Sequence, residues 1–258
     1  MTRQARVKSS TGVYHVIVRG ANKQAIFHDD ADCRMFLDAL HKYKRRTDLK
    51  VFAWCLMNNH AHLLIKEGHE SISATMKRVG VSYVSYYNEK YETTGHLFQD
   101  RFRSENVETR GYLLTVTRYI HQNPVKAGMV KKPDDWEWSS CAEYYGEITY
   151  PRGLLDQSYI LELFSPDHAV GMREFKVFNE AFNSDECLEE RVEKRRLSDD
   201  EARTQIKKLL CNLKIAQVKS LPKKQRDEIL REMKSIDRIS QRQAARILGI
   251  SPNLFYKA

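Results

Sequence analysis

The sequence predicts an α+β protein in which an antiparallel sheet carries helices on one face, followed by an all-α C-terminal region. Three observations predict this architecture. Strand-like and helix-like apolar spacings alternate along residues 1–150 in the order strand, helix, strand, strand, helix, strand, helix. Two of the strands are separated by a single Asn-Asn pair, which favours a hairpin. From residue 197 onward, helical spacings recur.

The first strand is expected at residues 13–19, where β-branched and aromatic residues are enriched, and a turn is expected at residues 20–23. Asp30 or Asp32 then offers a side chain that can cap a helix N-terminus. Apolar residues recur after it at near-helical intervals and predict the first helix. They are Met35, Phe36, Leu37, Leu40 and Tyr43.

The next segment predicts a β-hairpin. Residues 51–57 are an apolar run of strand length, and Asn58-Asn59 is the expected turn into a second strand. Because alternate residues of a strand point to the same face, His60 and His62 on that second strand should share one face.

Two helices and one strand complete the predicted sheet region. Ser71 is expected to start a helix, and residues 98–107 alternate partly, as a further strand would. Residues 111–122 have helical spacing. This helix is expected to stop at Asn123-Pro124, because proline disfavours the helical conformation in the residue before it.

The chain is expected to have three parts: a domain of residues 1–150, a connecting segment of residues 151–196 and a helical module of residues 197–258. The module holds fourteen Lys and Arg against seven Asp and Glu, so most of the formal net charge of +9 lies there. An excess of this kind suits a polyanionic partner, nucleic acid first, although many soluble proteins are basic without one.

The last part of the chain predicts a helix-turn-helix. Ser198 starts the module with a capping-box pattern, and Pro222 suits the first turn of another helix. Ser240 then caps a short helix, Gly249 forms a turn and Ser251 caps a second helix.

Composition excludes several classes of protein. No run of about 18 apolar residues occurs, so no membrane span is expected, and the N-terminus lacks the apolar segment of a signal peptide. We therefore expect a cytoplasmic protein. The five cysteines are widely spaced and form no C-x-x-C motif, which favours reduced thiols over disulfides or a zinc site.

Four polar residues fit one reaction. In a helix, Tyr119 and Asn123 lie at i and i+4 and share a face. His60, His62 and the Asn123 amide, with open positions remaining, suit Mg²⁺ or Mn²⁺ better than structural zinc. Such a metal would polarise a scissile phosphate, and Tyr119 would attack the phosphorus to leave a 5′-phosphotyrosine link and a free 3′-hydroxyl. Each residue taken alone is more often structural.

These residues also resemble a known family. His60-Ala61-His62 is similar to the HUH motif of single-tyrosine transposases, and residues 119–128 are similar to the nucleophile helix of the IS200-like, REP-associated tyrosine transposases. The resemblance covers roughly residues 10–145, and its motifs together are specific. Three other segments resemble the family in the expected order: Arg19-Gly20, residues 98–102 and residues 136–140.

The resemblance implies an HUH, ferredoxin-like core in which His60, His62 and Asn123 bind the metal and Tyr119 is the nucleophile. The family cuts and rejoins single-stranded DNA near imperfect hairpins. By resemblance, the partner is single-stranded or REP-like hairpin DNA, and the protein is a monomer or a homodimer. His121 neighbours the nucleophile in sequence but should face away from it.

The DNA-contacting residues form a wider set. Arg101 and Arg103 alternate and would share a face, where they could contact phosphates or equally stay solvated. Tyr83, Tyr86 and Tyr87 could stack on bases, but their helical spacing favours a place in the core. The candidates in the C-terminal module are Gln241, Arg242, Asn253 and Lys257.

The function predicted is metal-dependent cleavage and rejoining of single-stranded DNA. Two alternatives stay open. One is a DNA-binding regulator whose transposase core does not cut, and the other is a metal-dependent phosphodiesterase that uses water instead of a tyrosine. The intact set of four site residues favours cleavage and rejoining over both alternatives.

Overall fold

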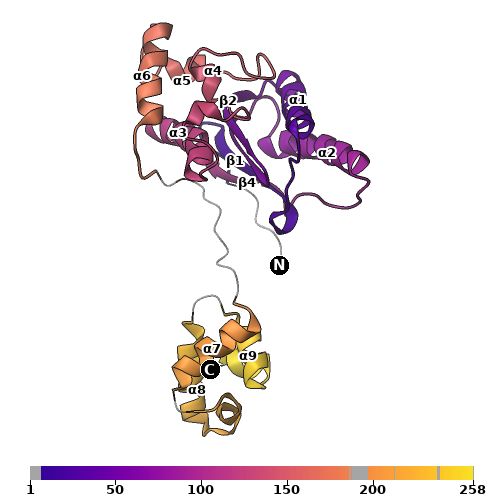
Figure 1. The fold of residues 1–258 in the computed structure, drawn as a ribbon, viewed down its shortest axis with the longest axis vertical. Coiled ribbons are helices and arrows are strands. Elements are labelled where there is room, and N and C mark those ends of the chain that lie inside the picture. The colour runs from indigo at the N-terminus through magenta and orange to yellow at the C-terminus, as the bar shows by residue number, and fades with distance from the viewer. Residues whose placement is uncertain (1–6, 186, 188–196, 212, 237–238, 258) are drawn as a thin grey trace. The chain divides into compact units, whose positions relative to one another are not determined.

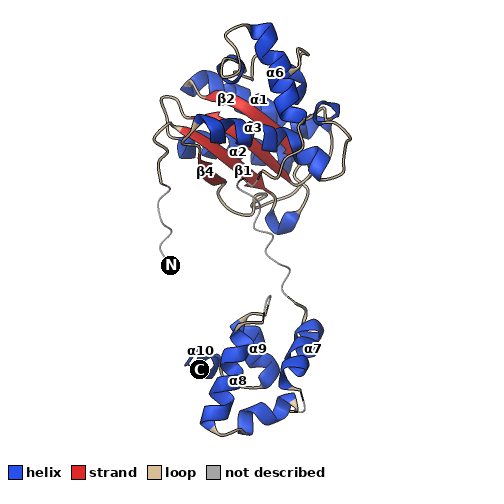
Figure 2. Cartoon of the chain, turned by 90° about the vertical axis from the view of Figure 1, so that its left-hand side faces the viewer, coloured by secondary structure: helices blue, strands red, loops and turns tan. Residues whose placement is uncertain are grey.

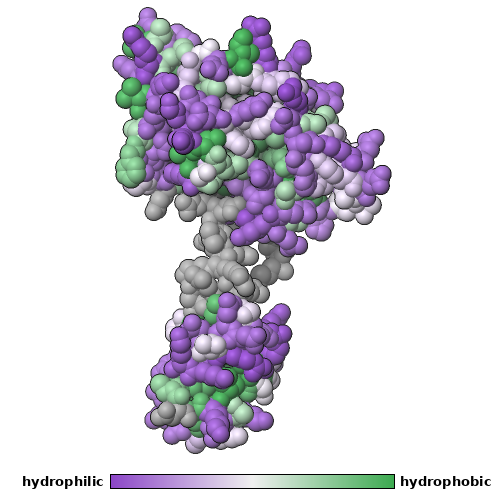
Figure 3. All heavy atoms as spheres, viewed as in Figure 1, coloured by the Kyte–Doolittle hydropathy of each residue, from purple (hydrophilic) through white to green (hydrophobic). Residues whose placement is uncertain are grey.

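A computed structural model describes residues 7–185, 187, 197–211, 213–236 and 239–257 (Figure 1). The chain divides into two compact units, Met1–Leu188 and Glu189–Ala258. Hydrophilic residues predominate on the face of each unit seen in Figure 3. Among the described residues, no helix is long and apolar enough to cross a membrane. All five cysteines are free.

The first unit is built on a four-stranded antiparallel sheet of order β2-β3-β1-β4. Strands β2 and β3 form the predicted hairpin, in which Met57 pairs with His60. The Asn58-Asn59 pair therefore sets the register of the strand that carries both histidines. The strands are β1 (Val13–Arg19), β2 (Lys50–Met57), β3 (His60–Lys66) and β4 (Arg103–Asn106).

Helices cover both faces of this sheet, which corrects the expectation of one covered face. Helices α1 (Asp30–Thr47) and α2 (Ile72–Lys90) lie on one side, and α3 (Arg110–Lys126) lies on the other (Figures 1 and 2). Successive residues of β1, β2 and β3 are buried regardless of the face to which they point. Sheets covered on both sides have such continuous apolar strands, and this pattern distinguishes them from strands with one solvated face.

Helix α3 runs through Pro124 to Lys126, although Asn123-Pro124 was expected to end it. Pro124 lacks the N–H that would bond to the Ile120 carbonyl, but only two helical residues follow, so the helix forgoes little. Beyond the helix end, the Met129 amide donates a hydrogen bond to the Pro124 carbonyl. The buried proline ring contributes apolar contacts that offset the lost hydrogen bond.

Residues 151–185 pack into the core of the first unit and do not behave as the expected connecting segment. Leu154, Leu155 and Phe175 are buried in the same cluster as the sheet residues. Shared apolar burial makes these residues part of the same domain as the sheet. The remaining helical elements described in the first unit are η1 (Ala21–Lys23), η2 (Pro133–Asp135), α4 (Cys141–Tyr144), α5 (Ser158–Leu161) and α6 (His168–Glu180).

The second unit has a separate hydrophobic core, to which Ile206, Leu230 and Phe255 contribute. Ser198 caps its first helix through a capping box, and Ser240 caps α9. Its elements are α7 (Asp199–Leu210), η3 (Ile215–Ser220), α8 (Lys223–Lys234), α9 (Gln241–Leu248) and α10 (Pro252–Lys257). Gly249 ends α9 at φ +67°, a conformation that glycine adopts without steric cost, and α9 packs against α10.

Asp29 caps α1, in place of the expected Asp30 or Asp32, by accepting a hydrogen bond from the Asp32 amide. The Asp32 carboxylate is buried instead, and it accepts hydrogen bonds from Lys90 Nζ at 2.7 Å and Tyr91 Oη at 2.8 Å. Burial raises the pKa of Asp32, but the bonds from Lys90, the His28 amide and Tyr91 outweigh it and hold the pKa below its ordinary value. This network ties α1 to α2.

We expect Asp32→Asn to lower the free energy of unfolding of the first unit by about 2 kcal/mol at pH 7, because the charged hydrogen bonds from Lys90 and Tyr91 are lost while Lys90 keeps its exposed partner Asp29. A carboxyl whose folded pKa is depressed contributes stability above its unfolded pKa of about 4 and loses it as the pH falls through the folded value. The difference between wild type and variant should therefore shrink in acid. Urea unfolding at pH 7 and pH 3, followed by tryptophan fluorescence, measures this.

Fluorescence isolates the first unit because all three tryptophans, Trp54, Trp136 and Trp138, lie in it. Asp30→Asn, at an exposed position on the same helix, is the matched control and should change stability by less than about 1 kcal/mol. A difference for Asp32→Asn that is equally large at pH 3 would contradict the role given to this carboxylate.

Candidate active site

Strand β3 presents His60 and His62 on the face of the sheet that α3 covers. Their ring centroids are 4.9 Å apart. Helix α3 brings Tyr119 over the same face, with its ring centroid 5.8 Å from that of His62. Three of the four predicted site residues are thus neighbours, although almost 60 residues separate them in sequence.

His62 is 1% exposed and lies beside a third histidine, His15 of β1. His15 Nε2 is 3.1 Å from His62 Nδ1, and the two rings lie edge to edge, with centroids 5.3 Å apart and planes inclined by 27°. The His15 and Tyr119 rings also make an edge-to-face contact, with their centroids 5.8 Å apart. Burial lowers the pKa of His15 to about 3, so this imidazole is neutral at pH 7.

His60 and His62 are neutral at pH 7 as well. Burial, and then the charge of Arg19, lowers the pKa of His60 to about 4. Burial and the neighbouring imidazoles lower the pKa of His62 well below its ordinary value. Neutral imidazole is the form that binds metals. His60 Nδ1 is 2.6 Å from Asn59 Oδ1, which can only accept, so His60 donates from Nδ1 and its lone pair is on Nε2.

Asn123 lies one helical turn beyond Tyr119 and is half-buried. Its Nδ2 donates to the Tyr119 carbonyl at 2.8 Å, which leaves the amide oxygen as the atom suited to a metal. In the described part of the chain, no group of three or more His, Cys, Asp or Glu side chains could hold a metal ion. A site at the histidine pair would therefore need a third ligand of another kind, and an amide oxygen fits Mg²⁺ or Mn²⁺.

Tyr119 is 6% exposed, and its ring contacts those of His15 and His62. Lys126 Nζ lies 4.9 Å from the centroid of the ring, within cation–π range. A positive charge at this position also favours a phosphate or a phenolate nearby.

Sequence reasoning missed His15 and Lys126 as site residues. His15 had a detectable signal, because it is a titratable residue in the middle of a strand that is mostly apolar as far as Arg19. Lys126 lies seven residues after Tyr119, which is two helical turns and the same face, but the expected helix end at Pro124 concealed this relation.

His121 faces away from the site, as predicted. It is fully buried and bonds to Ser140 Oγ at 2.9 Å and Asn179 Oδ1 at 3.2 Å. Tyr83 and Tyr87 are core residues and Tyr86 is partly buried against the same core, so the place in the core favoured for these tyrosines is confirmed for two of the three.

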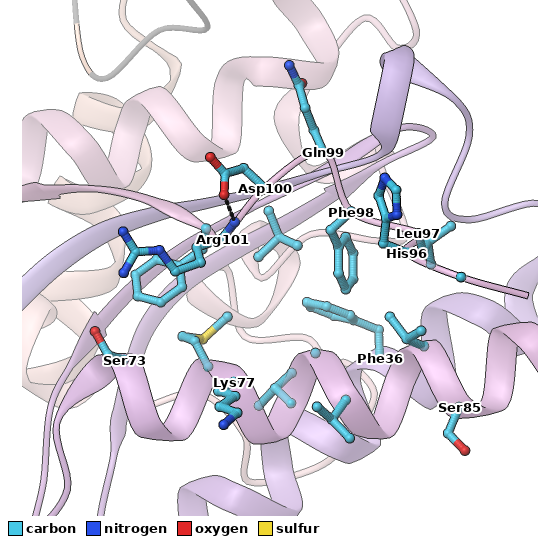
Figure 4. A pocket seen from close by; sticks show the side chains of 18 residues that line it. Phe36, Ser73, Lys77, Ser85, His96, Leu97, Phe98, Gln99, Asp100 and Arg101 are labelled. Atoms are coloured by element: carbon cyan, nitrogen blue, oxygen red, sulfur yellow. Dashed lines mark hydrogen bonds between the residues drawn. The ribbon is translucent and has the colours of Figure 1, made fainter. Parts of the chain in front are cut away.

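Arg101 and Arg103 are both exposed. Arg103 pairs with Ile17, the residue that also pairs with His62, so it lies on the active-site face of the sheet. Arg101 borders a cleft of about 1040 Å³ between α2 and residues 95–102 (Figure 4). Lys77 of α2 lies on the other wall of this cleft, and Phe98 points into it. The cleft has an apolar interior, and two cations, Lys77 and Arg101, and one carboxylate, Asp100, are among the residues that line it.

The candidates of the second unit lie on α9 and α10. Arg242 and Asn253 are exposed, and Gln241 is half-buried. The side chain of Lys257 lies outside the described residues. Helix α10 has six residues, which is fewer than two turns.

The first unit is similar to known proteins in sequence and in fold. Residues 8–123 match the family model described as transposase IS200 like. A REP-associated tyrosine transposase of Escherichia coli (strain K12) is 26% identical over 152 residues, which are 58% of this chain and 87% of the relative. A solved structure of a REP-associated tyrosine transposase bound to a REP hairpin covers 58% of this chain and 89% of its own, with a TM-score of 0.50 at 22% identity, and shows a shared fold. Residues 8–123 of the first unit therefore match an IS200-like transposase domain, and the relative found in Escherichia coli is a REP-associated tyrosine transposase, the family that the sequence motifs resemble.

Proposed function

We propose that this protein cleaves and rejoins single-stranded DNA at hairpin-flanked sites through Tyr119. The observation that carries the proposal is the convergence of Tyr119 with the His60–His62 pair on one face of the sheet. A tyrosine beside two neutral imidazoles can act as a nucleophile, and a water-dependent phosphodiesterase would not need it there. The name of the solved relative includes a REP hairpin, which supports hairpin DNA as the substrate.

In this reaction the Tyr119 Oη forms a bond to phosphorus while the bond from phosphorus to the 3′ oxygen breaks. The phenolic proton leaves Tyr119, and the departing 3′ oxygen becomes a hydroxyl. The DNA is then held as a 5′-phosphotyrosine ester, and attack by a 3′-hydroxyl reverses the step with no loss of bond energy. Lys126, over the Tyr119 ring, would favour the negative charge that accumulates as the phenol loses its proton.

His60, His62 and the Asn123 amide oxygen would hold a divalent metal such as Mg²⁺ or Mn²⁺. When bound there, it would withdraw charge from the scissile phosphate and orient it. The chain's own contribution is placement. The hairpin register sets the spacing of the histidines, and the i, i+4 relation of Tyr119 and Asn123 sets the nucleophile beside a ligand.

The reaction itself is the test. The purified protein should form an adduct with a hairpin-bearing single strand that survives denaturant, in the presence of Mg²⁺ or Mn²⁺, and should form none with the fully paired duplex. Binding of the single strand without any adduct would contradict cleavage and would support a regulator that binds DNA without cutting it. Hydrolysis without an adduct would support a water-dependent phosphodiesterase.

The cleft beside Arg101 suits an unpaired strand. Single-strand binding combines cations that follow the phosphates with aromatic rings on which bases stack. Lys77 and Arg101 are exposed at the rim, and Phe98 lies inside (Figure 4). A polyanionic strand is complementary to this charge, and we propose that it passes here on its way to the Arg103 side of the sheet.

Arg101→Ala should weaken single-strand binding and reduce the slope of log affinity against log salt by about 0.7, the value expected for one phosphate contact. Arg173→Ala, which removes an exposed arginine from α6, is the control and should leave the slope unchanged. Fluorescence anisotropy over a salt series measures both. Equal slopes for the two variants would exclude Arg101 as a phosphate contact.

We also propose that the second unit is a DNA-binding module with a helix-turn-helix formed by α9 and α10. Its excess of basic residues supports this, and so does the exposure of Arg242 and Asn253 on these helices. Because α10 is short, the module would contribute phosphate contacts more than base readout in the major groove.

Removal of residues 197–258 should weaken DNA binding and flatten its salt dependence, while a high DNA concentration restores cleavage by the first unit. Each unit buries its own hydrophobic core, so the truncated protein should remain folded. Affinity and adduct yield measured across a salt series would decide the matter. An unchanged slope would contradict a DNA-binding role, and loss of cleavage at saturating DNA would mean that the second unit helps to build the active site.

A further inference from the structure

We propose that His15 is a positioning residue for the metal site: it accepts a hydrogen bond from His62 Nδ1–H and thereby directs the lone pair of His62 Nε2 toward the metal. The inference rests on the metal site of the proposed function. It concerns the pair of imidazoles on neighbouring strands β1 and β3, whose nitrogens are 3.1 Å apart.

The two strands place these rings side by side. His62 pairs with Ile17, and His15 lies two residues from Ile17 on the same face of β1. His15 is fully buried, and its ring meets that of His62 edge to edge, with centroids 5.3 Å apart and planes inclined by 27°, as a hydrogen bond between ring nitrogens requires. Both side chains are buried, at 0% and 1% exposed, so water does not compete for this hydrogen bond.

One proton lies between the two nitrogens. The nitrogen to which this proton is covalently bound decides whether His62 can bind a metal. If His62 donates from Nδ1, its lone pair is on Nε2 and is available to a cation. If His15 donates from Nε2, the His62 proton is on Nε2 and the metal is excluded. The tautomer of a metal-binding histidine is commonly fixed in this way by a partner of its other nitrogen.

The companion ligand supports the first direction. His60 donates from Nδ1 to Asn59 Oδ1 at 2.6 Å, an oxygen that can only accept. Each histidine of the pair therefore has its Nδ1 in a hydrogen bond to a residue outside the pair. In the direction proposed here, the two imidazoles offer the same nitrogen, Nε2, to one metal. His15 Nδ1, which is buried and has no hydrogen-bond partner among the described residues, would then carry the His15 proton.

The test compares His15→Leu with His15→Gln in the full-length protein. Leucine fills the buried space without an acceptor, whereas the glutamine amide oxygen can replace Nε2 as the acceptor. Titration with Mn²⁺, followed by electron paramagnetic resonance, should give an affinity about 10–100-fold weaker for His15→Leu, and glutamine should restore most of it. Cleavage by His15→Leu should recover at high Mn²⁺, because the loss is in affinity. Tryptophan fluorescence checks that the first unit is folded.

Equal Mn²⁺ affinity for wild type and a folded His15→Leu would overturn the inference. The wild-type protein decides the matter independently of any variant through ¹⁵N NMR of its histidine rings, which distinguishes the tautomers. We expect the His62 proton on Nδ1, and a proton on His62 Nε2 would overturn the proposal even if the leucine variant failed to fold. Absence of Mn²⁺ binding by the wild type would instead contradict the metal site of the proposed function, while the NMR result would still decide the direction of the hydrogen bond.

Discussion

Tyr119→Phe is expected to abolish the covalent adduct with single-stranded DNA while leaving DNA affinity within about twofold. The substitution removes only the hydroxyl, so the ring keeps its contacts with His15, His62 and Lys126. Loss of a nucleophile costs up to about 10⁶-fold in other covalent enzymes, and we expect at least about a 10³-fold fall in adduct formation. Denaturing gel electrophoresis of labelled DNA measures the adduct.

Tyr112→Phe is the matched control. Tyr112 lies seven residues before Tyr119 on α3 and therefore on the same face of that helix. Its hydroxyl donates to Glu105 Oε2 at 2.7 Å, and burial and that hydrogen bond raise its pKa, so it is a poor nucleophile. Adduct formation should survive Tyr112→Phe. If it survives Tyr119→Phe instead, the nucleophile is another residue.

His60→Ala is expected to weaken Mn²⁺ binding by more than about a hundredfold and to reduce cleavage in proportion. Loss of a group that merely supports a ligand costs about 10–100-fold, and His60 would itself be a ligand. The change should be well tolerated by the fold, because His60 is only partly buried at the start of β3. Isothermal titration of Mn²⁺ into the metal-free protein gives the affinity directly.

His168→Ala controls for the removal of a histidine. His168 is exposed at the first position of α6, and its loss should change neither metal affinity nor cleavage. An unaltered Mn²⁺ affinity for His60→Ala would mean that the metal binds elsewhere. The same titration with Asn123→Ala examines the third ligand, whose amide oxygen is still a prediction.

The strand and helix signals that could be read from the sequence were local. The β1 bounds, the Asn58-Asn59 hairpin and the caps at Ser71 and Ser240 agree with the structure. Each depends on backbone geometry or on a hydrogen bond within about four residues, and such preferences act before any tertiary contact forms. The shared face of His60 and His62 is of the same kind, since it follows from the two-residue period of a strand.

The errors arose where packing overrides a local preference. Pro124 lies within α3 because its buried ring and the Met129 amide compensate for what the helix loses. Residues 151–185 were expected to belong to a connecting segment, yet Leu154 and Phe175 join them to the core. Asp32 looked like a helix cap but serves as the buried partner of Lys90, a residue 58 positions away.

By itself, the sequence determined the strand that carries both histidines, the helix that carries Tyr119 and Asn123, and the family to which these motifs point. Only the tertiary structure decided that α3 lies over the histidine face, that His15 reaches His62, and that Lys126 stands over the Tyr119 ring. The physical reason is range. Periodicity and capping are set by neighbours along the chain, whereas contacts across a sheet depend on strand order and on which face each helix buries, and these are settled by the apolar packing of the whole unit.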